Sequence, residues 1–148
     1  MPPTVCPKGT TIYDPKKCFN GYTALPFPID GKPGALLIDM NGERVHQWVL
    51  DSGDLRGGVP RARLLPDGHM LVLRQGRKGD RYGGGQEYDW DGKLVWEYEP
   101  PEGWEPHHDI FRKANGNTLL VCREMTPEAY RRKAKDPARR ERDRKSVV

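Results

Sequence analysis

The sequence predicts an all-β protein built from repeated strand pairs, and three observations support this. Gly42 and Gly92 occupy matching places in IDMNGERVHQW and YDWDGKLVWEY, 50 residues apart. Gly68 and Gly116 do the same in LPDGHMLVL and KANGNTLLV, 48 residues apart. The 17 glycines and 14 prolines suit many short strands joined by turns and suit long helices poorly. A near-constant period of about 50 residues indicates stacked supersecondary units.

Four hairpins follow from this pattern. Asn41-Gly42, in the first of them, is typical of a two-residue turn in which both central residues need positive φ. One further short strand is expected within residues 21–28, before prolines stop it. Residues 75–85, including the triple glycine Gly83–Gly85, are predicted to be a flexible loop, and so are residues 100–106. The predicted strand pairs are Ala35–Met40 with Arg44–Leu50, Arg61–Leu65 with Met70–Arg74, Glu87–Trp90 with Lys93–Glu99, and His107–Lys113 with Thr118–Arg123.

The size of these units indicates β-propeller blades. Residues 61–99 hold four consecutive antiparallel strands, about one blade. The chain before them would supply the outer half of an earlier blade, and the chain after them the inner half of a later one. The predicted fold of residues 1–125 is therefore a partial β-propeller of about two blade-equivalents. Because propellers close with about 4 to 8 blades, one copy is not expected to close, whereas a homo-oligomer of three copies would complete a ring.

Residues 126–148 are predicted to form a separate basic tail. They carry nine Lys and Arg against four Asp and Glu, which leaves 16 and 17 of these in residues 1–125. Thr126 can cap a helix, Pro127 suits its first position, and Pro137 ends it. Beyond that the tail is too charged to pack and is expected to be disordered. Its Lys and Arg residues could contact phosphates, but Tyr130 is its one aromatic residue, so a solvated tail is favoured and no nucleic-acid partner is expected.

Cysteine usage and hydropathy restrict the compartment. A Cys6–Cys18 bridge can form, but three cysteines cannot all pair, and reduced thiols are favoured in a chain without a visible secretory signal. No apolar run comes near the roughly 20 residues that span a bilayer. No membrane partner is therefore expected, and a cytoplasmic location is the default expectation.

The strongest candidate site is the run His107, His108 and Asp109, at the start of a predicted innermost strand beside the axial channel. Imidazole titrates close to neutral pH and can carry a proton during group transfer. Arg61 and Arg63 lie one repeat earlier, and cationic groups there would hold an anion in the same channel. Strand alternation would put His107 and Asp109 on one face and His108 on the other, unless the strand entrance is irregular.

Other interpretations stay open at these residues. The run can be a polar cap on a strand entrance. A metal site is disfavoured because adjacent histidines seldom bind one ion through both rings, so no metal and no cofactor is expected. Trp104, in the preceding loop, could wall an aromatic substrate. His46 and His69 are interpreted as structural or surface residues, and the following aromatic residues as packing: Trp48, Trp90, Trp96 and Tyr98.

Several segments, in order, resemble the N-terminal part of the arylsulfotransferase family over roughly residues 10–125: TIYDPKKCFNGYTALPF, LIDMNGERVHQW, LLPDGHMLV, EYDWDGKLVWEYE and HHDIFRKANGNTLLV. The resemblance implies a six-bladed propeller that moves a sulfuryl group from an aryl sulfate to a phenol through a sulfated histidine. It implies that His107 or His108 binds or protonates the phenol while Asp109 orients a ring. The family's nucleophilic histidine is expected in later blades, so the chain is expected to be a truncated member. The alternative is a non-catalytic β-repeat interaction module.

Overall fold

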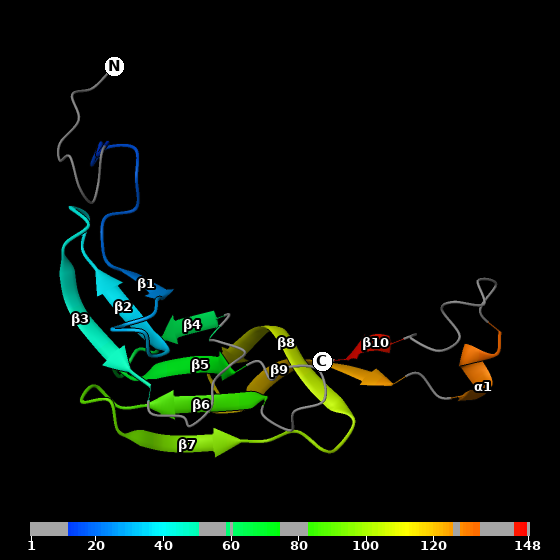
Figure 1. Ribbon diagram of the computed structural model, residues 1–148. Coiled ribbons are helices and arrows are strands. Elements are labelled where there is room, and N and C mark those ends of the chain that lie inside the picture. The colour runs from blue at the N-terminus through cyan, green and yellow to red at the C-terminus, as the bar shows by residue number, and fades with distance from the viewer. Residues whose placement is uncertain are drawn as a thin grey trace.

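The computed structural model describes residues 12–50, 59, 61–74, 83–125, 128–133 and 144–147. Within them the chain forms ten strands and one short helix, arranged in three antiparallel sheets (Figure 1). This confirms the all-β prediction. The elements are β1 (Thr23–Pro26), β2 (Gly34–Ile38), β3 (Arg44–Val49), β4 (Arg61–Leu64), β5 (Met70–Arg74), β6 (Gly84–Tyr88), β7 (Leu94–Tyr98), β8 (Trp104–Arg112), β9 (Thr118–Met125), α1 (Glu128–Arg131) and β10 (Arg144–Val147).

The strand order is simple in each sheet. The first sheet runs β1-β2-β3, the second β4-β5-β6-β7 and the third β10-β9-β8. The second sheet is the four-stranded unit that the sequence predicts for residues 61–99. In the described part of the chain no sheet closes on itself. Helix α1 is far too short to span a membrane, and the described part of the chain contains no other helix.

Strand β5 forms the centre of the core, because all five of its residues are buried. Met70 and Val72 pack in one cluster with residues of the first sheet. Leu71 and Leu73 point to the other face and pack against Ile110 of the third sheet. A strand buried on both faces has a continuous apolar run rather than an alternating one, which is the pattern here. The second sheet is therefore held between the other two.

The sequence repeat appears in the structure as the same turn geometry at four places, around Gly42, Gly68, Gly92 and Gly116. In each turn the N–H of a glycine donates to the carbonyl three residues earlier, at 2.9–3.1 Å, and the glycine φ lies between 81° and 87°. Asn41 does not have the positive φ expected for it, since Asp30 and His108 are the non-glycine residues with positive φ in the described ranges. The prediction of a two-residue turn at Asn41-Gly42 is therefore wrong. The loop is one residue longer, and only its glycine is left-handed.

Two of the three glycines in Gly83–Gly85 belong to a strand, so their interpretation as a flexible connection is wrong. Gly84 and Gly85 begin β6, where there is no room for a side chain. A Cβ on Gly84 would lie 2.1 Å from the carbonyl oxygen of Tyr98, and one on Gly85 would lie 2.7 Å from Cδ1 of Ile110. The glycines allow β7 and β8 to approach β6 closely.

The C-terminal region differs from the prediction in two ways. The helix in the described ranges is confined to α1, while Thr126, Pro127 and Pro137 lie outside those ranges. Residues 144–147, expected to be disordered, form β10 and pair with β9 in antiparallel register. Main-chain pairing to an open strand edge needs no apolar side chain, so a charged segment can supply it. In the same way, β8 begins at Trp104, inside the predicted loop 100–106.

Aromatic side chains tie the first sheet to the second. The indole N–H of Trp48 donates to the carbonyl of Asp89 at 2.9 Å, and Nε2 of His46 lies 2.7 Å from the carbonyl of Trp90. The His46 ring also stacks on Trp90, with ring centroids 4.0 Å apart. These contacts reach the turn between β6 and β7. Cys18 is a free thiol, and Cys6 lies outside the described residues.

We expect Gly84→Ala to destabilise the protein by about 1–3 kcal/mol, because its new methyl group would meet the backbone of β7 and force the strands apart. Urea unfolding followed by circular dichroism measures this. Gly21→Ala is the matched control, since a Cβ there would meet only the Phe19 ring at an ordinary 3.5 Å. Equal stability of the two variants would contradict the close approach at Gly84.

Candidate functional site

The His107–Asp109 run forms a bulge in β8. Pro106 pairs with Cys122 and Ile110 with Leu120, so three residues of β8 lie opposite one residue of β9. His108 has a φ of 68°, which costs a non-glycine residue on the order of 1–2 kcal/mol. The strand entrance is thus irregular, and simple alternation does not apply. His107 is buried, His108 is exposed, and Asp109 is half-buried.

Two arginines of β4 converge on this bulge. Nη2 of Arg63 donates to both carboxylate oxygens of Asp109 at 2.9 Å, and its Nε donates to the carbonyl of Ile110 at 2.7 Å. Nε of Arg61 lies 3.3 Å from the Asp109 carboxylate and donates to the carbonyl of His108 at 3.4 Å. The structure therefore brings Arg61 and Arg63 together with Asp109.

The charges in this arginine–aspartate cluster do not cancel. Two guanidinium groups face one carboxylate, and their side chains are 47%, 37% and 40% exposed for Arg61, Arg63 and Asp109. Partial burial acts to raise the pKa of Asp109, but the bonds from Arg63 and from the N–H of Ile110 outweigh it, and the pKa lies below its ordinary value. The carboxylate is thus ionised at neutral pH, and the cluster keeps an excess positive charge that an anion can approach from solvent.

His107 has a different environment from Asp109. Burial lowers its pKa, and the positive charges of Arg123 and His108 lower it further, against a smaller opposite effect of Glu105. Its ring lies edge-on to that of His108, with centroids 4.4 Å apart. At neutral pH the imidazole is therefore mainly uncharged and can accept a proton.

Trp104 lies in the wall of a cavity of about 600 Å³ between β7, β8 and β9. None of His107, His108 and Asp109 lines this cavity. Trp96 and Tyr98, interpreted from sequence as packing residues, form another part of its wall with their rings nearly parallel. Their spacing of two residues on one strand puts both on the same face, which is the signal that could have identified them.

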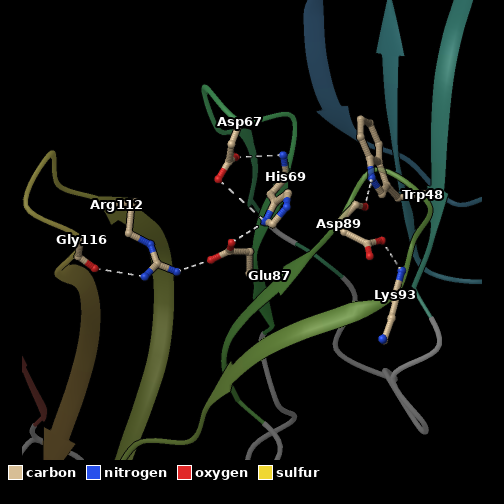
Figure 2. Close-up of polar contacts among 8 residues, drawn as sticks. All are labelled: Trp48, Asp67, His69, Glu87, Asp89, Lys93, Arg112 and Gly116. Atoms are coloured by element: carbon tan, nitrogen blue, oxygen red, sulfur yellow. Dashed lines mark hydrogen bonds and ion pairs between the residues drawn. The ribbon is translucent and has the colours of Figure 1, made fainter.

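A second polar cluster lies where the β4–β5 turn of the second sheet meets β6 and β8 (Figure 2). Nδ1 of His69 lies 2.7 Å from Oε1 of Glu87, whose other carboxylate oxygen accepts a hydrogen bond from Arg112. The bond to Glu87 raises the pKa of His69, with a smaller contribution from Asp67, while burial opposes the shift. The interpretation of His69 as a structural or surface residue did not foresee this cluster.

The comparisons with known proteins find no relative: no protein-family model matches the chain, and no curated protein matches it significantly. What the structure defines is an all-β protein of three antiparallel sheets with an arginine–aspartate cluster at a strand bulge.

We expect His107 and His69 to titrate on opposite sides of the ordinary histidine pKa of about 6.5. Burial lowers the pKa of His107, whereas the bond to Glu87 raises that of His69. Imidazole chemical shifts followed by NMR from pH 4 to 9 measure both, and His107→Gln and His69→Gln assign the signals. Equal pKa values for the two rings would show that these contacts do not persist in solution.

Asp109→Asn should lower stability at pH 7 by less than about 1 kcal/mol, since the pairing groups are partly exposed. The folded-state pKa of Asp109 is depressed, so its stabilisation is present above the unfolded-state pKa and is lost as pH falls through the folded-state value. The difference between wild type and variant should therefore shrink as the pH falls below the ordinary aspartate pKa of about 3.9. Urea midpoints at pH 7 and pH 3 test this, with Asp91→Asn, in an exposed turn, as control.

Proposed function

We propose that the chain forms part of a β-propeller of the arylsulfotransferase type and that the cluster of Arg61, Arg63 and Asp109, with His107 and His108, binds the sulfate end of an aryl sulfate. The observation that carries this proposal is the convergence of two arginines from β4 on the strained bulge of β8. Backbone strain that is held in place by surrounding contacts is frequent at functional sites.

The sheet arrangement supports the propeller part of the proposal. β4 and β8 each stand at the start of a sheet and contact one another through Arg61 and Arg63. The first strands of neighbouring propeller blades are related in this way around the central channel. The turn glycines match β2 and β3 with β6 and β7, so β1 corresponds to β5. By the same matching, the equivalent of β4 in the first sheet would be supplied by another strand.

The chemistry of the cluster supports the ligand. A guanidinium group matches the oxygens of a sulfate ester in charge and planar geometry. An incoming sulfate would meet the excess positive charge at Arg61 and Arg63, and the neutral imidazole of His107 can take the proton that an acceptor phenol loses. By resemblance, the histidine that receives the sulfuryl group is not one of these residues. The residues of this cluster bind the substrate and exchange the proton of the phenol.

We expect an aryl sulfate to bind, and Arg61→Ala to weaken that binding by at least about tenfold, since a charged hydrogen bond contributes roughly 1.5–3 kcal/mol. Isothermal titration calorimetry measures this, with the corresponding uncharged phenol as a second ligand. The phenol should show no such loss. Arg44→Ala, on exposed β3, is the matched control and should bind like wild type.

No release of a coloured phenol from the aryl sulfate is expected when a second phenol is present. Turnover that His107→Ala abolishes would contradict that expectation and make the cluster a complete catalytic site. Equal affinity of wild type and Arg61→Ala for the aryl sulfate would contradict the proposed binding site.

The second candidate function is a non-catalytic interaction module. Exposed apolar side chains on the outer strands β3 and β7 favour it: Val45, Val49, Leu94, Val95 and Tyr98. Such exposed strand edges are surfaces on which another chain can pair, including a second copy of this one. A chain that associates in light scattering but does not bind the aryl sulfate would favour this second function.

A further inference from the structure

We propose that Asp67, His69 and Glu87 form a binding site for a divalent first-row transition-metal ion. The site lies where the β4–β5 turn meets β6 (Figure 2), and it shares no residue with the arginine–aspartate cluster. It does not depend on the proposed sulfate site.

The geometry of the three side chains suits one ion. Nδ1 of His69 lies 2.7 Å from Oε1 of Glu87 and 3.9 Å from Oδ2 of Asp67, and one ligand atom from each residue lies within 4.8 Å of the others. An ion bound at about 2.0–2.2 Å holds neighbouring ligand atoms roughly 3–3.5 Å apart. The two spacings from His69 lie on either side of that range, and small side-chain rotations would bring the three ligand atoms onto one ion.

A comparison within the chain shows that the turn itself does not require these residues. The next repeat has Asn115-Gly116-Asn117 where this one has Asp67-Gly68-His69. In both turns the first side chain accepts a hydrogen bond from the backbone N–H two residues later, at 3.1 Å. Asparagine therefore suffices for the turn, and the carboxylate and imidazole at residues 67 and 69 need another explanation.

Glu87 is also a potential metal ligand that its repeat equivalent lacks. The matching position in the first sheet is Leu37, which is buried. The Glu87 side chain is only 13% exposed, and a carboxylate at such a position needs compensating partners. Arg112 binds one oxygen and is itself fixed by a bond to the carbonyl of Gly116, which leaves Oε1 directed at His69.

The bond from Arg112 to Glu87 resembles the hydrogen bonds by which residues outside the coordination shell orient metal-binding carboxylates. A bound metal ion displaces the proton from the His69 ring, and Asp67 and Glu87 against Arg112 then leave one net negative charge to hold the cation. One imidazole nitrogen and two carboxylate oxygens form a donor set of intermediate hardness, which suits zinc, cobalt and manganese. Magnesium and calcium take oxygen donors, and copper(I) takes sulfur. The Asp67 side chain is 60% exposed, so water can reach the site and fill the remaining coordination positions.

Co²⁺ is the probe that tests the site, because its visible absorption reports bound nitrogen and oxygen ligands and a thiolate ligand adds a distinct near-ultraviolet band. We expect the full chain to bind one Co²⁺ with visible absorption and no thiolate band. The double variant Asp67→Asn/His69→Asn recreates the Asn-Gly-Asn turn that the chain already uses, so it should keep the wild-type circular dichroism. Its Co²⁺ affinity should fall by at least about tenfold.

Glu87→Gln should weaken Co²⁺ binding as well, since it removes the charge but keeps the shape. His108→Asn is the control for a histidine outside the site: asparagine tolerates the left-handed φ there, and Co²⁺ affinity should not change. Three results would each overturn the proposal. These are no Co²⁺ binding at millimolar concentration, equal affinity of the double variant and wild type, or a thiolate absorption band.

Discussion

The burial of β5 on both faces is the constraint on which the rest of the structure depends. Its side chains alternate between two apolar clusters, one shared with the first sheet and one with the third. Neither outer sheet has a comparable core of its own among the described residues. The strands next to β5 must therefore let other strands approach closely, which explains why β6 begins with Gly84 and Gly85. Polar side chains of the second sheet come from the strands on either side of β5, as Arg63 of β4 and Glu87 of β6 do beside Leu71.

The contact between β4 and β8 is both structural and chemical. Arg61 and Arg63 bind the carbonyls of His108 and Ile110, so they compensate for the strain of the bulge and attach the third sheet to the second. The same guanidinium groups carry the charge that an anionic ligand would meet. Substituting Arg63 would therefore change stability and binding together. Arg61, with longer and more exposed contacts, separates the two effects better.

The strands and turns could be predicted because their signals are local. Glycines that recur at turns, and apolar runs beside them, depend on a few neighbouring residues. The errors arise where distant contacts decide. Gly84 looks like a loop residue until the backbone of β7 is placed against it, and β10 exists because β9 offers an open edge. For the candidate site, the repeat alignment put Arg61 and Arg63 at the positions equivalent to Asp109 and Phe111, and in the structure Arg63 contacts Asp109. It could not show that Trp104 lies in a separate cavity.

Comparison of the repeats with one another separates structural from chemical requirements in a way that a single residue cannot. Where two equivalent positions make the same backbone contact, as Asp67 and Asn115 do, the contact cannot explain why the residues differ. Where a buried leucine in one sheet becomes a glutamate in the next, the loss of apolar packing has to be offset by new partners, and Arg112 and His69 are those partners. Both differences meet at one place in the second sheet. The carboxylates of Asp67 and Glu87 are two independent differences from the repeat, and both face the imidazole of His69. This is the physical reason for assigning a chemical role to the region around the β4–β5 turn.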